Sequence, residues 1–405
     1  MVMTKEVLYS LTKGAYAPQE EMLEVARKKG KLYIGIPKEI AYQEHRVSLV
    51  PDAVALLVNN GHRIVVQAGA GKAANFEDHE YSEAGAEIVQ LPEDVFKADT
   101  IFKIAPPTAE EIVFMKPKQT LFSALQLTVQ PQDFLKKLIA KKLNCVAFGW
   151  IIDEAGTLPV IRAMGEIAGG ASISIAAELL SNANNGMGSL LGGISGISPT
   201  EVVIIGAGNV GEFAARAALG LGATVKVFDN STSRLRRLQN QLGTRVFTSI
   251  IVPKVLEKHL RSADVAIGAL RATRGRTPCV VTEKMVSEMK NGAVIIDVSI
   301  DQGGVFETSK VTNHSQPTFR EHGVIHYCVP NINSRVARTA SYALSNIFTQ
   351  IILSMGDEGG FDAIVRKDAG LRNGVYIYNG ILTNQYLGEL FHIPFKDINL
   401  LMAAI

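Results

Sequence analysis

The chain has 405 residues, 47% of them hydrophobic, and a formal net charge of +2. A nearly neutral chain without a sustained basic block lacks the positive field typical of nucleic-acid-binding proteins, so we expect small-molecule ligands and no nucleic acid. At about 150 residues per domain, the length favours two domains.

No hydrophobic run approaches the roughly 20 residues that a membrane helix needs, and the first residues lack the order of a signal peptide. This predicts a cytoplasmic protein that has no membrane partner. Three widely spaced cysteines, Cys145, Cys279 and Cys328, match neither a disulfide framework nor a zinc-binding pattern. We therefore expect three buried thiols and no metal site.

The first part of the chain predicts a polar extension and then an α/β domain. Residues 1–30 form the extension. From residue 32, short hydrophobic runs alternate with amphipathic segments, a pattern typical of a parallel sheet with crossover helices. The expected elements are strands over 32–36, 63–67, 100–104, 120–123 and 144–148, and a helix over 52–60. No glycine-rich nucleotide motif occurs in this part.

A long apolar helix is expected over 161–182, followed by a tightly turning glycine-rich loop over 186–193. The composition of this helix fits a subunit interface and a buried core helix equally well.

The most informative stretch follows this loop. The run Val202-Val203-Ile204-Ile205 leads into Gly206-Ala207-Gly208-Asn209-Val210-Gly211, a Gly-x-Gly-x-x-Gly motif between an expected strand and an expected helix. In such motifs Gly206 makes the turn, Gly208 lets main-chain N–H groups approach a pyrophosphate, and Gly211 packs helix against strand. The alternative is a glycine-rich turn without a ligand.

Asp229 ends the next expected strand, at about the 20-residue spacing of a ribose-binding acid. An acid at this point would repel a 2′-phosphate, so the predicted cofactor is NAD rather than NADP.

Later strands are expected over 265–269, 293–298 and 326–329, and a helix over 339–346 would return the chain to the first domain. The predicted fold class is α/β, with two Rossmann-like, doubly wound parallel-sheet domains and an active-site cleft between them. The predicted domains are a substrate domain, 31–158 plus 338–405, and an NAD-binding domain, 159–337.

Several separate stretches resemble the alanine dehydrogenase and nicotinamide nucleotide transhydrogenase family, over residues 33–344. They are Gly35-Ile36-Pro37-Lys38-Glu39, Glu44-His45-Arg46-Val47, Gln67-Ala68-Gly69-Ala70-Gly71, Gly192-Gly193-Ile194-Ser195-Gly196-Ile197, the Gly206–Gly211 motif, Asp297-Val298-Ser299-Ile300-Asp301-Gln302-Gly303-Gly304, Tyr327-Cys328-Val329-Pro330-Asn331 and Thr339-Ala340-Ser341-Tyr342-Ala343-Leu344. The resemblance implies a two-domain subunit, commonly a homo-hexamer among the alanine dehydrogenases. Transhydrogenases pair the same fold with membrane domains that are not found in this chain.

The implied activity is an NAD-dependent amino-acid dehydrogenase, which converts L-alanine, NAD and water to pyruvate, ammonium and NADH. Arg46 matches the family's carboxylate-binding arginine, and a guanidinium can grip a carboxylate through two parallel bonds. Asp301 matches the cleft-facing aspartate and is assigned to proton handling. Asn331, at a strand end, is predicted to hold the nicotinamide carboxamide.

The sequence departs from the dehydrogenases at two positions. Ala105 stands where they carry a substrate-binding lysine, and Gln126 stands where they carry a proton-carrying histidine. Gln126 is predicted to bind substrate or to orient the nicotinamide. Lys103 is the candidate catalytic replacement: in a partly dry cleft its pKa should fall, which would make it a proton carrier. A merely structural lysine at a strand edge is an equally good interpretation.

Two alternatives to alanine dehydrogenation stay open. One is a related dehydrogenase for a different amino acid or imine, and the other is a catalytically inactive NAD(H)-binding sensor or assembly protein. His45 and His326 are more typical of structural histidines. Arg271, Arg274 and Arg276 crowd one loop and face either the cofactor phosphates, an acidic partner or solvent.

Overall fold

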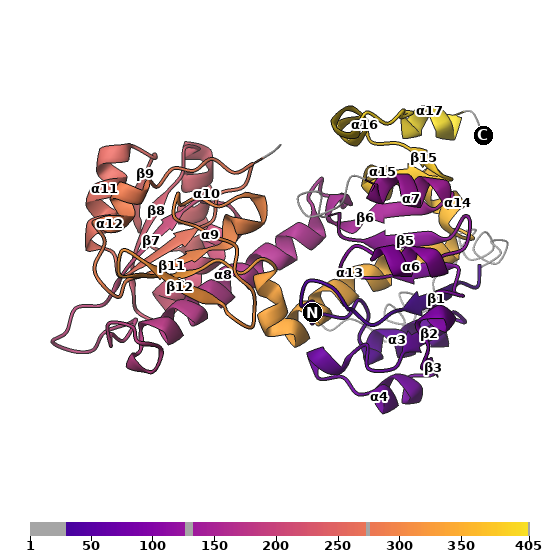
Figure 1. Ribbon diagram of the computed structural model, residues 1–405, viewed down its shortest axis with the longest axis horizontal. Helices are drawn as coiled ribbons and strands as arrows, with labels where there is room; N and C mark the ends of the chain where they lie inside the picture. Colours follow the sequence, from indigo (N-terminus) through magenta and orange to yellow (C-terminus); the bar gives the residue numbers. More distant parts are fainter. Residues whose placement is uncertain (1–29, 126–132, 273–275, 404–405) are drawn as a thin grey trace, which may run out of the picture.

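The structure, a computed structural model, describes residues 30–125, 133–272 and 276–403. Within these residues the chain forms an eight-stranded sheet and a seven-stranded sheet. Each sheet is the centre of one lobe, and the two lobes lie side by side (Figure 1). The predicted N-terminal extension therefore lies almost entirely outside the described residues.

The strands of the first sheet are β1 (Tyr33–Ile36), β2 (Arg63–Gln67), β3 (Glu87–Val89), β4 (Thr100–Phe102), β5 (Thr120–Ser123), β6 (Asn144–Ala147), β14 (Val375–Tyr378) and β15 (Ile381–Leu382). Their order in the sheet is β15-β14-β6-β5-β4-β1-β2-β3. Strands β1 to β6 pair in parallel. Strand β14 runs antiparallel to β6, and β15 runs antiparallel to β14.

The strands of the second sheet are β7 (Glu201–Ile205), β8 (Thr224–Phe228), β9 (Phe247–Ser249), β10 (Val265–Gly268), β11 (Val294–Asp297), β12 (Thr318–Glu321) and β13 (Val324–Tyr327). They are arranged in the order β12-β13-β11-β10-β7-β8-β9. All neighbours pair in parallel except β12, which is antiparallel to β13. The predicted α/β class with two doubly wound sheets is confirmed, and the antiparallel edge strands are an addition to it.

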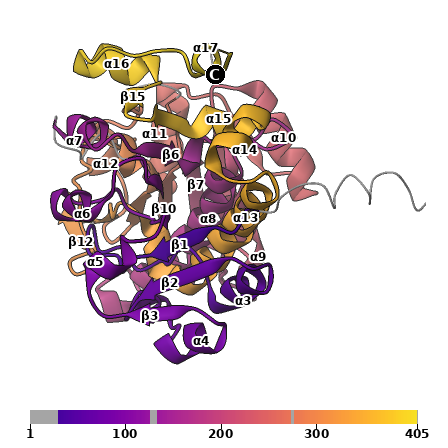
Figure 2. The ribbon, with the colours of Figure 1, turned by 90° about the vertical axis from the view of Figure 1, so that its right-hand side faces the viewer.

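The helices are α3 (Pro51–Asn59), α4 (Asp78–Glu83), α5 (Pro92–Val95), α6 (Ala109–Phe114), α7 (Phe134–Ala140), α8 (Pro159–Leu180), α9 (Asn209–Gly220), α10 (Thr232–Leu242), α11 (Pro253–Ser262), α12 (Glu283–Ser287), α13 (Ala337–Asp357), α14 (Phe361–Lys367), α15 (Ala369–Gly374), α16 (Gln385–Phe391) and α17 (Ile398–Ala403). Figure 2 shows the first lobe from its free side, with α4 near one end and α16 and α17 at the other.

Helices α8 and α13 run between the lobes (Figure 1). Val160, near the start of α8, packs in the core of the first lobe. Ala168 and Leu180, further along α8, pack in the core of the second. By length and composition α8 is the one helix among the described residues that meets the criterion for a membrane-spanning helix, a criterion that buried core helices also meet.

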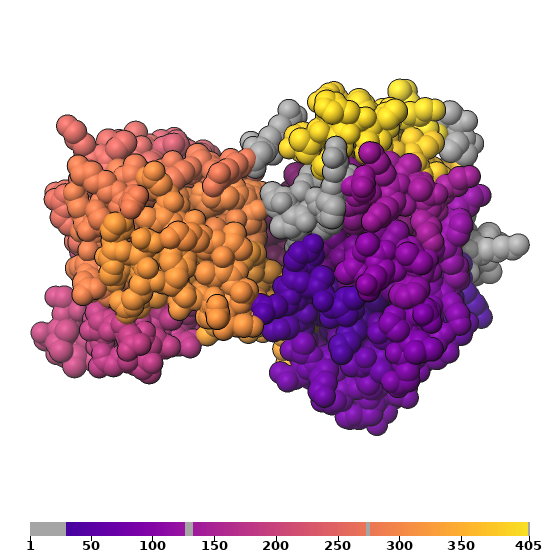
Figure 3. All heavy atoms as spheres, in the orientation of Figure 1, coloured from indigo at the N-terminus to yellow at the C-terminus, as the bar shows by residue number. Residues whose placement is uncertain are grey.

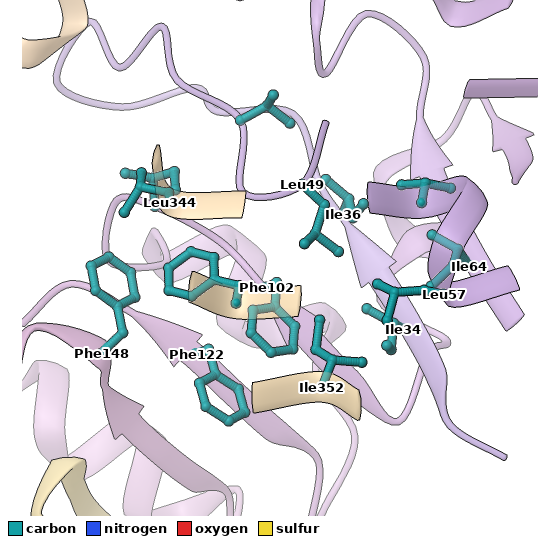
Figure 4. Packing of buried hydrophobic residues seen from close by; sticks show 14 of the residues in the cluster. Ile34, Ile36, Leu49, Leu57, Ile64, Phe102, Phe122, Phe148, Leu344 and Ile352 are labelled. Atoms are coloured by element: carbon teal, nitrogen blue, oxygen red, sulfur yellow. The ribbon is translucent and has the colours of Figure 1, made fainter. Parts of the chain in front are cut away.

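The core of the first lobe is rich in aromatic side chains (Figure 4). Phe102 on β4 stacks on Phe122 of β5, with ring centroids 4.3 Å apart. Phe348 on α13 lies 5.6 Å from Phe102 and 5.1 Å from Phe148. Because Phe102 is the last residue of β4, this packing fixes the main chain directly before Lys103.

The α8–α9 contact depends on a glycine. A Cβ atom on Gly169 would lie 2.4 Å from the Val210 carbonyl oxygen and 2.8 Å from the Ala214 nitrogen, both on α9. The neighbouring Gly170 has no atom within 4 Å of its Cβ position. The two adjacent glycines therefore provide a test of this packing and its control.

We predict that Gly169→Ala destabilises the protein by about 1–3 kcal/mol, because the added methyl group forces α8 and α9 apart. Gly170→Ala adds the same group in open space, so it should be neutral or stabilising by up to about 1 kcal/mol. Thermal unfolding of the two variants and the wild type measures the difference. Equal melting temperatures for the two variants would contradict close α8–α9 packing.

Candidate active site

The glycine motif makes the turn from β7 into α9. Gly206 has φ of 122°, and its Cβ would lie 2.3 Å from the Ala269 carbonyl oxygen. A Cβ on Gly211 would lie 1.8 Å from the Gly206 oxygen, whereas the Cβ position of Gly208 has nothing within 4 Å. Gly206 and Gly211 are thus required by packing, and Gly208 leaves the start of α9 open to a ligand. This division matches the chemistry of a dinucleotide turn.

Asp229 follows β8 and is 3% exposed. Its carboxylate accepts hydrogen bonds from the N–H groups of Ala207, at 2.8 Å, and Ser231, at 2.7 Å. The Arg234 guanidinium lies 3.9 Å away. The predicted ribose-binding acid is therefore at the expected strand end, where it also ties that end to the glycine turn.

Arg46 forms a bidentate ion pair with Glu44. Its Nε donates to Oε1 at 2.8 Å and its Nη2 donates to Oε2 at 2.6 Å. Burial alone would raise the pKa of Glu44, but the charge and hydrogen bonds of Arg46 lower it to about 2. This pair occupies the Nε–Nη2 edge of the guanidinium, and Nη1 donates to the Met164 sulfur at 3.2 Å.

The Glu44 carboxylate also links the two lobes. It accepts a bond from Asn331 Nδ2 at 2.7 Å and one from Ser334 Oγ at 2.8 Å. Nearby, Gln43 Nε2 donates to Ser315 Oγ at 2.8 Å. In Figure 3 the indigo surface of the first lobe meets the orange surface of the second. The loop that carries Arg46 is thus bound to the segment that carries Asn331.

Asn331 follows β13 and has φ of 59°, in the left-handed region. Its main-chain N–H donates to the Asp301 carboxylate. Its side-chain Nδ2 is shared between Glu44 and Ser334 Oγ, the latter at 2.7 Å. The amide is therefore held in place, and its role toward a nicotinamide stays a prediction.

Asp301 lies in a short 3-10 helix, η4 (Val298–Gln302), directly after β11. Its side chain retains exposed surface. Desolvation by the surrounding protein nevertheless raises its pKa to about 6, although Asn331 and Arg46 oppose the shift. A pKa of about 6 suits acid–base chemistry near neutral pH.

Asp297, which the sequence interpretation did not single out, organises the loop around Asp301. Its carboxylate accepts bonds from Ser299 N at 3.1 Å, Val305 N at 2.9 Å and Ser309 Oγ at 2.6 Å. Ser299 and Val305 lie on either side of Asp301, so one buried side chain closes the loop. Its charge also contributes to the raised pKa of Asp301.

The environment of Lys103 differs from the partly dry cleft that the sequence predicted. Its side chain is fully buried, with Nζ 2.7 Å from Glu39 and 3.1 Å from Glu111. Burial alone would lower the pKa of Lys103, but the two carboxylates outweigh it and raise the pKa. The expected fall in pKa is wrong, because tertiary packing encloses this lysine between two acids.

Neither acid was proposed from the sequence. Glu39 belongs to the Pro-Lys-Glu motif and also accepts a bond from Ile104 N at 2.5 Å. Glu111 forms a capping box with Thr108 at the start of α6. The Thr-x-x-Glu spacing was the signal available for that cap, but nothing local indicated its contact with Lys103.

Other predicted residues have mixed outcomes. Gln126 and Arg274 lie outside the described residues. His326 is buried, with Nε2 2.8 Å from Thr308 Oγ1 and Nδ1 3.1 Å from the Val324 oxygen, which is typical of a structural histidine.

Cys145 and Cys328 are buried as expected, whereas Cys279 is exposed. Within the described residues, no group of three His, Cys, Asp or Glu side chains could hold a metal ion.

We predict that Lys103→Met destabilises the protein by about 3–5 kcal/mol, because it leaves Glu39 and Glu111 buried without their cation. Lys97→Met is the matched control, since its partner Asp94 is a surface residue, and it should leave the melting temperature nearly unchanged. If both variants melt like the wild type, the buried ion pairs do not stabilise this lobe. Loss of activity in Lys103→Met would not by itself indicate a catalytic role.

Comparisons with known proteins agree with this geometry. Residues 35–168 match the alanine dehydrogenase/PNT N-terminal domain, and residues 172–385 match the C-terminal domain of the same family. Alanine dehydrogenase 2 of Staphylococcus aureus is 39% identical over 366 residues, which cover 90% of this chain and 98% of that protein.

Solved structures give the same result. An L-alanine dehydrogenase superposes with a TM-score of 0.83 at 35% identity, over 89% of this chain and 99% of that one. A transhydrogenase from Sinorhizobium meliloti shares the fold, with a TM-score of 0.73 at 23% identity, over 87% of this chain and 99% of that one. With both domains matched and its Arg46 and Asp301 segments meeting between the lobes, the chain belongs to the alanine dehydrogenase/PNT family.

Proposed function

We propose that the protein is an NAD-dependent amino-acid dehydrogenase that converts L-alanine, NAD and water to pyruvate, ammonium and NADH. The observation that carries this proposal is the junction of Arg46, Asp301 and Asn331, which brings a carboxylate-binding group and an acid–base group to one place. Family membership supplies the reaction class. We retain the domain boundaries predicted from the sequence, and a cytoplasmic homo-oligomer stays a prediction.

The residues present fit NAD. The open Cβ position of Gly208 and the start of α9 suit the pyrophosphate, and Asp229 is assigned to a ribose hydroxyl. Bound NAD would supply the acceptor for the substrate's hydride. Asn331 is assigned to the nicotinamide carboxamide, and Gln126 keeps its predicted polar role.

On the substrate side, Arg46 would hold the carboxylate through the guanidinium N–H groups that Glu44 does not occupy, because Glu44 fixes the orientation of the guanidinium. Asp301, as a carboxylate, would accept a proton from the substrate ammonium group or from the water that adds to the imine carbon. We assign Lys103 an electrostatic role, since a lysine with a raised pKa, enclosed by two acids, is a poor proton carrier.

A second candidate is dehydrogenation of a different amino acid or imine. It is favoured by Ala105, which removes a positive charge that the family places beside the substrate. Ala105 itself is buried, with 1% of its surface exposed. An NAD(H)-binding protein without catalysis remains the third interpretation.

We predict that the purified protein oxidises NADH with pyruvate and ammonium, and that Arg46→Ala raises KM for pyruvate strongly while NADH affinity stays near that of the wild type. Parallel assays with other 2-oxo acids distinguish the two dehydrogenase interpretations. Turnover with another oxo acid alone would replace alanine as the substrate. Binding of NADH without any turnover would instead favour the sensor interpretation.

We also predict an acidic limb in the pH profile. Because the pKa of Asp301 is raised to about 6, its carboxylate form dominates above this pH and is lost below it. The kcat/KM for alanine deamination should therefore fall as the pH drops through about 6. Asp301→Asn cannot titrate, so it should have low activity without this limb. An unchanged limb in Asp301→Asn would assign the titration to another group.

A further inference from the structure

Arg271 lies in the loop after β10 and is not used by the proposed mechanism. Among the described residues it makes no ion pair or hydrogen bond. Arg276, in the same loop, donates from Nη2 to the Gly303 carbonyl oxygen at 3.1 Å. Two arginines of one loop thus differ: the Arg276 guanidinium has a hydrogen-bond partner, and the Arg271 guanidinium has none within residues 30–125, 133–272 and 276–403.

The surroundings of Arg271 resemble those of Asp301 in one respect. The side chain retains exposed surface, yet desolvation lowers the pKa of Arg271, and no carboxylate opposes this shift. A guanidinium that is partly removed from water without a counter-ion raises the free energy of the unliganded protein. An anion that binds beside it would recover that free energy.

Main-chain contacts place the segment that carries Arg271 beside the glycine turn. A Cβ atom on Gly206 would be 2.3 Å from the Ala269 oxygen and 2.9 Å from the Leu270 nitrogen, so the end of β10 touches the glycine turn. The Leu270 oxygen accepts a bond from Ser299 Oγ at 2.7 Å. The Ala272 nitrogen donates to Gln302 Oε1 at 3.2 Å. Arg271 is therefore anchored on both sides, directly beside the turn.

We propose that Arg271 binds the pyrophosphate of the dinucleotide, as a charged contact added to the N–H groups of the glycine turn. The inference rests on the proposed function, since it assumes that NAD is the cofactor. A guanidinium suits this role because its planar fork matches two phosphate oxygens at once. Asp229, at the end of β8 on the other side of β7, would remain with the ribose.

The test measures Kd for NADH, ADP-ribose and adenosine by calorimetry. ADP-ribose keeps the pyrophosphate without the nicotinamide, and adenosine lacks phosphate. Arg271→Ala should weaken NADH and ADP-ribose about tenfold or more, the loss expected for charge-assisted hydrogen bonds, and leave adenosine unchanged. Arg276→Ala is the matched control and should stay near the wild type. Arg271→Gln provides a second neutral variant if Arg271→Ala does not fold.

Several outcomes overturn the inference. Equal ADP-ribose affinity in the wild type and Arg271→Gln would do so. The inference is also overturned if Arg271→Ala raises KM for the 2-oxo acid at saturating NADH while nucleotide affinity is unchanged. That result would place the guanidinium beside the substrate. A wild-type protein that binds neither NADH nor ADP-ribose would instead remove the proposed function, and this result is distinguishable because it requires no variant.

Discussion

The buried Glu44–Arg46 ion pair is the interaction on which the site depends. Removing two charges from water is costly, and such a pair is tolerated when further hydrogen bonds satisfy its remaining atoms. Here Asn331 and Ser334 supply them from the other lobe. The electrostatic demand of one carboxylate thus sets the orientation of Arg46 and joins the two lobes at the same point. A shift of either lobe would leave a buried charge with fewer partners.

The second constraint is the position of strand ends. In open α/β sheets, ligands bind beyond the carboxyl ends of the strands. The glycine turn follows β7, Asp229 follows β8, Arg271 follows β10 and Asp301 follows β11. Parallel pairing brings these ends to one edge, so residues far apart in the chain become neighbours. Asp297 then fixes the loop after β11, since its carboxylate bonds main-chain groups on both sides of Asp301.

The charged residues of the two lobes lie in different electrostatic environments. Lys103 is buried and forms ion pairs with Glu39 and Glu111. The first lobe therefore contributes a fixed cation, Arg46, rather than a titrating base. The raised pKa of Asp301 places a titrating carboxyl in the second lobe. The proposed mechanism therefore divides the orientation of the substrate and the transfer of protons between the two lobes.

The sequence alone determined the α/β class, most strands, the glycine turn and the place of Asp229, because local hydrophobic periodicity and glycine spacing specify them. The resemblance added Arg46, Asp301 and Asn331 as candidates. Only the tertiary structure decided their environment. The fall expected in the pKa of Lys103 did not occur because Glu39 and Glu111, distant in sequence, enclose it. Asp297 was missed for the same reason, since its hydrogen bonds form only when the loop folds around it. The local sequence pattern specifies helices and strands, whereas the protonation and burial of a side chain depend on the distant residues that the fold brings into contact with it.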